Sequence, residues 1–294
     1  MRQSVRRWLT SACAVAVAGG SVIGAAGMAG ASPAVGAAGA ASAASAGQMA
    51  SAGQMASTAR SPRTARLTAV RWISPSRYLV LGDHGAAVTS IQRRLKQLKY
   101  YPGPVDGTVG LDTLEAVWAF KAVQHLRVTN ANQDDISRAT ERAMEHPLLP
   151  KLLHRHSASQ LRIEVNQSTQ VLVLYRHNKI ELISHVSTGG GYYYPCPPPG
   201  SGTCGPAITP DGTYRAHWFA PGWVKVPLGT MYNPVFFIGG AYAIHGDIPV
   251  PWYPASHGCV RIPMDIAPWF HKLIHVSQTD GTLIIIRGKA PYFL

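Results

Sequence analysis

Apolar residues recur at helical spacing in the segment 79–126. One predicted helix has its apolar face at Val88, Ile91, Leu95 and Leu98. The turn sequence PGPVDG at 102–107 follows this helix. A second helix is expected to begin at Asp112, with Glu115 completing a capping box. Its buried face is expected at Leu114, Val117 and Phe120. Residues 76–130 are therefore predicted to form a small all-α helical bundle.

Beyond residue 160 the pattern changes to that of β-strands. Short runs rich in β-branched residues are separated by turn sequences: LRIEV, QVLVLY, IELISHVST, GTYRAHW, PVFFIGG, AYAIHG and TLIIIRG. One helix is predicted at 265–274, with Ile266, Trp269, Phe270 and Leu273 on one face. Residues 161–290 thus predict a mainly β, sandwich-like domain with one prominent helix. The chain is expected to be multidomain, with 131–160 as a polar, helical connector.

The N-terminal part has the order of an export signal. Three arginines within the first ten residues precede an apolar run and the small-residue sequence Ala29-Gly30-Ala31, which predicts a signal peptide at 1–31. An uncleaved membrane anchor is the alternative, because the run is about long enough to span a bilayer. Residues 32–75 are rich in Ala, Ser and Gly and predict a disordered linker. The protein is expected to be exported to a cell wall or periplasm-like space, with membrane contact only during export or through that segment.

The chain of 294 residues carries a formal charge of +13. Cleavage after Ala31 removes three arginines and no acidic residue, which lowers the charge to +10. Basic residues are not interleaved with aromatic ones as in a nucleic-acid module, so no nucleic-acid partner is expected. The anionic polymers of a cell envelope are one partner that this charge favours; solubility alone is the other explanation.

Cysteine usage separates one thiol from the others. Removal of the leader takes away Cys13 and leaves Cys196, Cys204 and Cys259. Cys196 and Cys204 flank the sequence CPPPGSGTC and are the natural disulfide pair in an oxidising compartment. Cys259 is then an odd thiol in an exported protein.

The sequence ASHGCVRIP at 255–263 leaves several roles open for Cys259. His245 and His257 could each activate it as a nucleophile, and Gly258 would let the backbone expose amide groups toward a developing oxyanion. An inert buried thiol is one alternative. A zinc site formed with both histidines is another, but neither C-x-x-C nor H-E-x-x-H accompanies them, so no metal is expected.

Segment 82–120 resembles the peptidoglycan-binding module of cell-wall hydrolases. The resemblance lies in the order G-x-x-G-x-x-V-x-x-I-Q-x-x-L, then YYPGPVDG, then T-x-x-A-V-x-x-F. Lys121 stands where that family has a second glutamine. The resemblance implies either glycan binding or a structural companion to the following domain.

The sequences IHG at 244–246 and SHGCVR at 256–261 resemble the active-site signature of L,D-transpeptidase (YkuD-like) catalytic domains. Upstream segments VSTGGG, TPDGTY and MYNPVFFIGG extend the resemblance over 161–288. It implies that Cys259 is the nucleophile and that His245 is the general base, oriented by the carbonyl group of Gly246. It also implies that Gly258 and Cys259 donate amide groups to the oxyanion. The remaining implied site residues are His257, Ser256, Arg261 and, along the donor pocket, Tyr232.

Two aromatic residues in the loop before Ser256, Trp252 and Tyr253, are expected to wall the acceptor site or to pack the loop. The resemblance implies an enzyme without a cofactor that forms 3→3 cross-links between peptidoglycan stem peptides. A donor tetrapeptide would lose its terminal D-Ala, and an acceptor amine would resolve the thioester. Hydrolysis of the thioester, as in an L,D-carboxypeptidase, and attachment of a protein amine remain open. So does a catalytically silent wall-binding protein.

Overall fold

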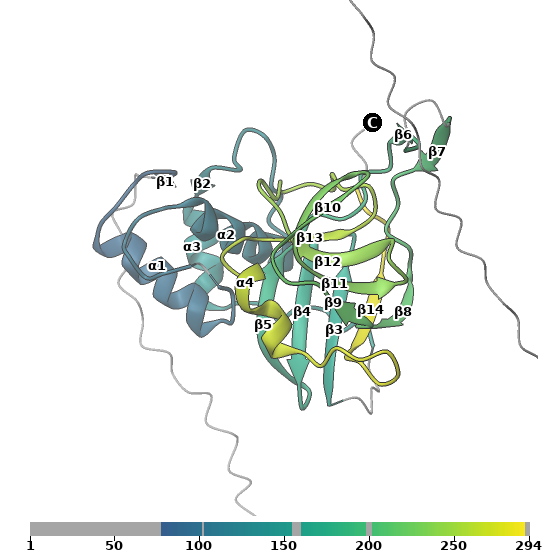
Figure 1. Ribbon diagram of the computed structural model, residues 1–294. Coiled ribbons are helices and arrows are strands. Elements are labelled where there is room, and N and C mark those ends of the chain that lie inside the picture. The colour runs from purple at the N-terminus through teal and green to yellow at the C-terminus, as the bar shows by residue number, and fades with distance from the viewer. Residues whose placement is uncertain (1–77, 102, 155–159, 198–201, 292–294) are drawn as a thin grey trace, which may run out of the picture. The chain divides into compact units, whose positions relative to one another are not determined.

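A helical part is followed by a mainly β part in the computed structural model, which confirms the predicted multidomain fold (Figure 1). The structure describes residues 78–101, 103–154, 160–197 and 202–291. The predicted leader and linker, and the first two residues of the predicted module, 76–77, lie outside these residues. Within the described ranges, no helix is both long enough and apolar enough to cross a membrane.

Three helices and one short strand pair form the helical part. They are α1 (Ala86–Gln97), α2 (Leu111–Val123) and α3 (Arg138–Glu145), with β1 (Leu79–Val80) antiparallel to β2 (Asp135–Ile136). The capping box expected at Asp112 is wrong, because α2 begins after Gly110 and no side chain caps it there. Glu115 instead lies buried in the second turn.

The predicted connector is not a separate segment over its first half. Ile136 and Met144 are fully buried in the core of the helical part. Arg94 on α1 donates from Nε and Nη2 to the carbonyl oxygen of Met144, at 2.9 and 2.7 Å. Residues 135–145 therefore complete the helical part, and sequence periodicity had missed this because β2 and α3 are short.

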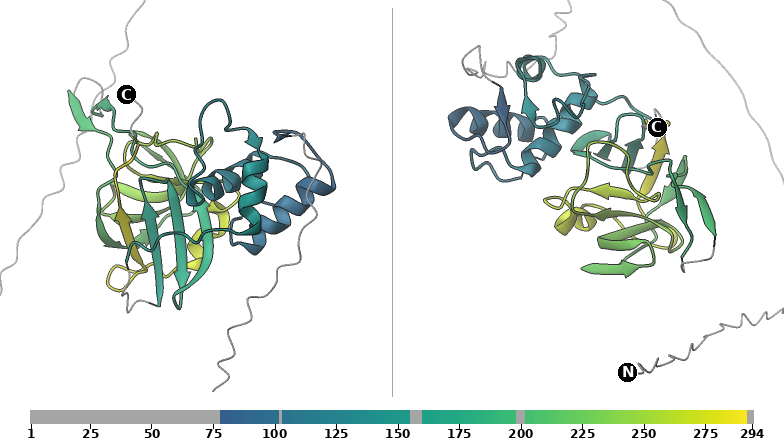
Figure 2. Two further views of the ribbon diagram at one scale, coloured as in Figure 1. Left: turned by 180° about the vertical axis from the view of Figure 1, so that it is seen from behind. Right: turned by 90° about the horizontal axis from the view of Figure 1, so that it is seen from above.

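Two five-stranded sheets pack face to face in the β part (Figure 2). The first has the order β5-β4-β3-β14-β8, with strands β5 (Lys179–His185), β4 (Val171–Arg176), β3 (Leu161–Asn166), β14 (Leu283–Arg287) and β8 (Gly212–Arg215). The second has the order β10-β11-β12-β13, with β9 also paired to β11. Its strands are β9 (Trp218–Phe219), β10 (Trp223–Val226), β11 (Gly229–Ile238), β12 (Tyr242–Gly246) and β13 (Val260–Ile262).

The run QVLVLY is apolar at consecutive positions because both faces of β4 are buried. Leu172 and Leu174 pack into the core between the two sheets. Val171, Val173 and Tyr175 point to the opposite face and join the core of the helical part. The helical part thus covers one face of the first sheet.

Two smaller elements complete the β part. The predicted helix at 265–274 is one α-helical turn, α4 (Ala267–Phe270), continued by a 3₁₀ turn over His271–Leu273. Strands β6 (Tyr193–Pro195) and β7 (Thr203–Pro206) form a hairpin that belongs to neither sheet (Figure 1).

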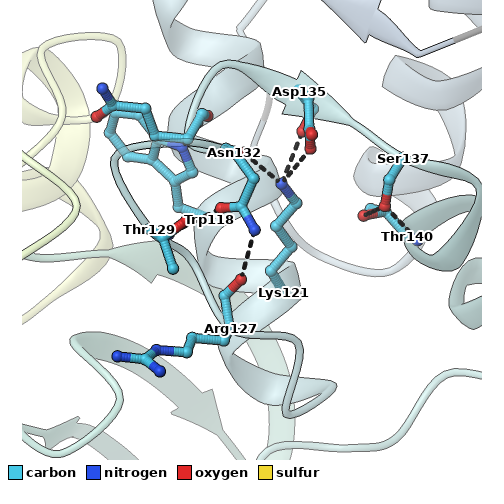
Figure 3. Close-up of polar contacts among 9 residues, drawn as sticks. Trp118, Lys121, Arg127, Thr129, Asn132, Asp135, Ser137 and Thr140 are labelled. Atoms are coloured by element: carbon cyan, nitrogen blue, oxygen red, sulfur yellow. Dashed lines mark hydrogen bonds and ion pairs between the residues drawn. The ribbon is translucent and has the colours of Figure 1, made fainter.

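Lys121, at the position of the family's second glutamine, holds a loop of the helical part in place (Figure 3). Its buried ammonium group donates to the carbonyl oxygens of Asn132 and Asp135, at 3.0 and 2.7 Å, and to Asp135 Oδ1 at 2.9 Å. Asn132 in turn donates from Nδ2 to the carbonyl oxygen of Arg127 at 3.0 Å. All three donors of Lys121 are used within the protein, so this lysine has a structural role here.

Candidate active site

Cys259 and His245 line the same cavity in the β part, which has a volume of about 480 Å³. The turn between β10 and β11 forms one wall, with Val226, Pro227, Leu228 and Met231. The β6–β7 hairpin contributes Tyr194 and Pro197. Ser256, His257, Asp247 and Arg261 supply the polar lining. The cavity lining therefore combines apolar residues with a small set of polar groups and one thiol.

Parallel pairing of β12 with β13 brings Cys259 and His245 to one face of the second sheet. His245 pairs with Arg261, and Ile244 pairs with Val260. Side chains two residues apart on a strand point to the same face, so Cys259 lies on the same face as Arg261 and diagonally adjacent to His245. Residues 14 positions apart in the chain are thus neighbours because of the sheet register.

The ring of His245 has a defined tautomer. Its Nδ1 lies 2.9 Å from the carbonyl oxygen of Gly246, which can only accept a hydrogen bond. Nδ1 must therefore carry the proton, and Nε2 keeps a lone pair. Burial lowers the pKa of His245 below its usual value, and the Gly246 carbonyl only partly offsets this. At neutral pH His245 is a neutral imidazole that can accept a proton at Nε2.

The thiol of Cys259 is held in its protonated form in the free protein. Burial raises the pKa of Cys259 above its usual range, and a backbone hydrogen bond from Ala243 lowers it by less. Its Sγ also lies 3.8 Å from the carbonyl oxygen of Ala241. The pair is thus a neutral thiol beside a neutral imidazole, an arrangement that needs proton transfer during attack.

Hydrogen bonds of two hydroxyl groups, from Ser256 and Thr209, hold the loop 255–259 that carries the thiol. Ser256 donates from Oγ to the carbonyl oxygen of Cys259 at 2.6 Å and accepts the amide N–H of Gly258 at 3.0 Å. Thr209 donates from Oγ1 to the carbonyl oxygen of Gly258 at 2.7 Å. The Gly258 amide, expected as an oxyanion donor, is therefore already used by Ser256.

Glycine is required at two positions of the site. Gly258 has φ 138°, and a Cβ there would come within 2.6 Å of Tyr242 Cε1 and 2.8 Å of the Ile208 carbonyl oxygen. A Cβ on Gly246 would lie 2.5 Å from Cβ of Ala267. Larger residues would displace the loop or the end of β12.

A charged pair lies at the cavity beside the thiol. Arg261 Nε is 2.9 Å from Asp247 Oδ2, and both side chains are largely buried. Asp247 also accepts the amide N–H of Ile248 at Oδ1, 2.8 Å away. Both residues line the cavity, so the pair contributes a guanidinium group and a carboxylate to it.

His257 is packed between two tyrosines of the β6–β7 hairpin region. Its ring centroid lies 4.7 Å from that of Tyr194 and 5.5 Å from that of Tyr192, both in edge-to-face geometry. Burial, together with Arg261, lowers the pKa of His257. The predicted disulfide between Cys196 and Cys204 is present and closes this hairpin.

Three aromatic residues named from the sequence do not line the cavity. Tyr232 is not a lining residue, because Met231 packs with Cys259 whereas Tyr232 packs against the core between the two sheets. Its ring contacts Trp223 at 5.1 Å and packs into the core of the β part. Trp252 packs against the core of the helical part, and Tyr253 stacks edge-on against Trp252 at 5.4 Å. Both therefore pack the loop, the second of the two roles expected for them.

Three other residues at the site had no role from the sequence. Thr209 stands within the motif segment TPDGTY, and Asp247 directly follows the motif IHG, so those motifs were the available signal. Tyr194 belongs to a run of three tyrosines before the disulfide, and nothing in its spacing placed it beside Cys259. Among the described residues, no group of three or more His, Cys, Asp or Glu side chains is placed to hold a metal ion.

Comparison with known families agrees with this geometry. Residues 160–286 match the family model of the L,D-transpeptidase catalytic domain. The β part belongs to that family. Residues 84–129 match the family model of a peptidoglycan binding domain. Together the two domains support an enzyme that acts on peptidoglycan.

Solved structures include several L,D-transpeptidases. One from Xylanimonas cellulosilytica is 29% identical with a TM-score of 0.63, covering 73% of this chain and 100% of that one. One from Stackebrandtia nassauensis is 16% identical with a TM-score of 0.42, covering 75% and 100%. L,D-transpeptidase 1 from Mycobacterium tuberculosis is 20% identical with a TM-score of 0.31, covering 44% and 62%. No curated protein matches the chain. The structural likeness rests on the first of these.

Proposed function

We propose that the protein is an exported peptidoglycan L,D-transpeptidase that forms 3→3 cross-links through a thioester on Cys259. One observation carries the proposal: His245, with Nδ1–H bound to Gly246, lines the same cavity as the only free thiol among the described residues. A general base with a defined tautomer beside a nucleophile is the arrangement that acyl transfer needs. The family match to residues 160–286 supports peptidoglycan as the substrate.

The first half-reaction acylates the enzyme. Cys259 Sγ attacks the carbonyl carbon of the third stem residue while the thiol proton moves to His245 Nε2. The C–N bond to terminal D-Ala then breaks, and His245 returns the proton to the departing amine. The products are a thioester on Cys259 and free D-Ala. The Cys259 amide is the remaining candidate donor to the oxyanion, because Ser256 uses that of Gly258.

The second half-reaction restores the thiol. The side-chain amine of an acceptor stem attacks the thioester and loses a proton to His245, and the S–C bond breaks as His245 gives that proton to the departing Cys259 sulfur. Arg261 is placed in the cavity to bind a carboxylate group of the peptide. Water in place of the amine would give a trimmed tripeptide.

The test is mass spectrometry of disaccharide-tetrapeptide incubated with the protein, with Cys259→Ala as the matched control. A dimer that lacks one D-Ala and is absent with the variant is the expected product. Tripeptide without dimer would show that the activity is that of an L,D-carboxypeptidase and not that of a transpeptidase. No change that depends on Cys259 would overturn the proposal.

A further inference from the structure

The β6–β7 hairpin stands apart from both sheets, and its strand pairing is short and irregular. Tyr193 pairs with Pro206 and Pro195 pairs with Thr203, so one member of each pair is a proline without an N–H group. A two-stranded hairpin of this length is at best marginally stable alone. The Cys196–Cys204 disulfide, with Cα atoms 4.8 Å apart, links the residue after β6 to a residue within β7. The disulfide and the hydrogen bond from the Cys196 N–H to the carbonyl oxygen of Gly202, at 2.8 Å, therefore both constrain the outer part of this hairpin.

The base of the hairpin is joined to the loop that carries the thiol. Gly190 donates its amide N–H to the carbonyl oxygen of Ser256 at 3.0 Å, and Gly189 pairs with Ser256 as an isolated bridge. Tyr192 Oη donates to the carbonyl oxygen of Ala255 at 3.3 Å. The hairpin thus rises directly beside loop 255–259.

The three consecutive tyrosines divide between two faces of the hairpin. Tyr192 and Tyr194 point toward His257, as their edge-to-face contacts show, and Tyr194 lines the Cys259 cavity. Tyr193 points the other way, and 72% of its surface is exposed. The apolar residues Leu228 and Met231, from the turn between β10 and β11 and from β11, line the same cavity. The aromatic ring of Tyr194, two residues before the disulfide, is therefore part of the cavity wall.

We propose that Tyr194 is a specificity-determining residue: held by the Cys196–Cys204 disulfide, its ring limits the bulk of the group that reaches Cys259. In the proposed reaction, on which this part of the inference rests, the group beside the sulfur is the small terminal residue of the donor stem. Loss of the ring, or of the disulfide that holds it, opens the cavity to larger groups. His257 then serves mainly as the packing partner through which Tyr194 keeps its place.

The test compares two alkylating reagents with the same reactive group and different sizes, iodoacetamide and fluorescein iodoacetamide. The rate of modification of the Cys259 peptide is followed by mass spectrometry, so that the other cysteines do not contribute. Because both reagents attack the same thiolate, the ratio of their rates reports steric access and cancels any change in thiol pKa. This readout needs no turnover and stays informative if the proposed function fails.

Tyr194→Ala is expected to lower the ratio of small-reagent to large-reagent rates by roughly tenfold, the scale on which a pocket wall discriminates by size. Tyr194→Phe keeps the ring and is expected to keep the ratio. Tyr193→Ala is the matched control, since it removes the neighbouring ring that faces away from the cavity, and it too should keep the ratio. An unchanged ratio in Tyr194→Ala, or an equal change in Tyr193→Ala, would overturn the proposal.

The role of the disulfide has its own variant. Cys196→Ser with Cys204→Ser is expected to lower the ratio as Tyr194→Ala does, and addition of Tyr194→Ala should then change little. Reduction of the unaltered protein should have the same effect, which tests the proposal even if a variant does not fold. A normal ratio without the disulfide would show that Tyr194 is held by other contacts and would reject this part.

A substrate experiment follows where turnover is observed. Stem tetrapeptides ending in D-Ala or in a bulkier D-residue are compared by kcat and KM. The unaltered protein is expected to prefer D-Ala, and Tyr194→Ala is expected to reduce that preference by lowering KM for the bulky donor. Unchanged preference alongside a changed labelling ratio would show that the ring restricts access but does not select the donor.

Discussion

His245 donates its Nδ1–H to the carbonyl oxygen of Gly246, its own neighbour at the end of β12. A carbonyl group cannot donate, so this one contact fixes the tautomer and leaves Nε2 as the acceptor. The base therefore owes its orientation to the backbone and not to a third side chain. A Cβ at position 246 would collide with Ala267, so a larger residue there would displace the carbonyl group that orients His245.

Replacement of His245 should remove proton transfer while keeping the thiol. His245→Gln is expected to lower kcat by about 10²–10⁴-fold, because glutamine fits the site but cannot accept a proton. Cys259→Ala should abolish turnover, and both variants should keep the unfolding midpoint close to that of the unaltered protein. His257→Phe is the matched control, because it keeps the edge contacts with Tyr192 and Tyr194 and should cost far less. Equal decreases in kcat in the His245 and His257 variants would show that His245 is not the general base.

The free protein should react slowly with alkylating reagents at neutral pH. Burial raises the pKa of Cys259, so the thiolate is scarce until the pH exceeds the usual cysteine range. The rate of iodoacetamide modification at Cys259 is expected to climb throughout pH 6–9 without a plateau. Burial lowers the pKa of His245, so the acidic limb of kcat/KM should lie below pH 6.5. A plateau of alkylation near neutrality would instead indicate a preformed thiolate–imidazolium pair.

Much of the site was predictable because strands and motifs are local. The run AYAIHG located β12, which carries His245, whereas β13 was not among the predicted strands. Gly258 and Cys259, which directly precede β13, were found from the sequence ASHGCVRIP. The odd cysteine count isolated Cys259 and paired Cys196 with Cys204. These inferences needed only the sequence period and the spacing of reactive residues.

The sequence did not predict how the loops run or which face of a strand lines the cavity. Tyr232 and Met231 are adjacent in sequence, and only the register of β11 decides which one faces the cavity. Trp252 lies in a loop without periodicity, so its packing against the helical part was open. Glu115 matched a capping pattern, but burial of α2 on nearly every side places it in the interior.

The charges of Asp247 and Arg261 act in opposite directions on the reacting groups. Asp247 raises the pKa of both Cys259 and His245, and Arg261 lowers both. Asp247→Asn should therefore lower the thiol pKa and move the alkylation profile toward acid. Arg261→Gln should move it toward alkali. The pH dependence of Cys259 modification measures both, and shifts in the same direction would contradict the electrostatic account.

Glu115 should make the protein less stable as the pH rises. Burial, together with the nearby carboxylates of Asp265 and Asp112, raises the pKa of Glu115 to about 9. The unfolded chain ionises this group near pH 4.5, while the folded protein keeps the proton. Between these pH values the folded state binds more protons, so the free energy of unfolding falls with rising pH. Its slope from this group is about 1.4 kcal/mol per pH unit.

Glu115→Gln removes this titration without a change of shape. The variant should be more stable than the unaltered protein at pH 8 and should lose most of that advantage at pH 5. Denaturant midpoints at pH 5, 6.5 and 8 measure the difference, and Glu145→Gln on the exposed surface of α3 is the control. Burial also raises the pKa of Asp265 to about 7, so a residual slope should persist in Glu115→Gln below pH 7. A variant whose stability parallels that of the unaltered protein at every pH would show that Glu115 is ionised in the fold. Its carboxylate would then need a partner that the neighbouring Asp112 and Asp265, both acidic, cannot provide.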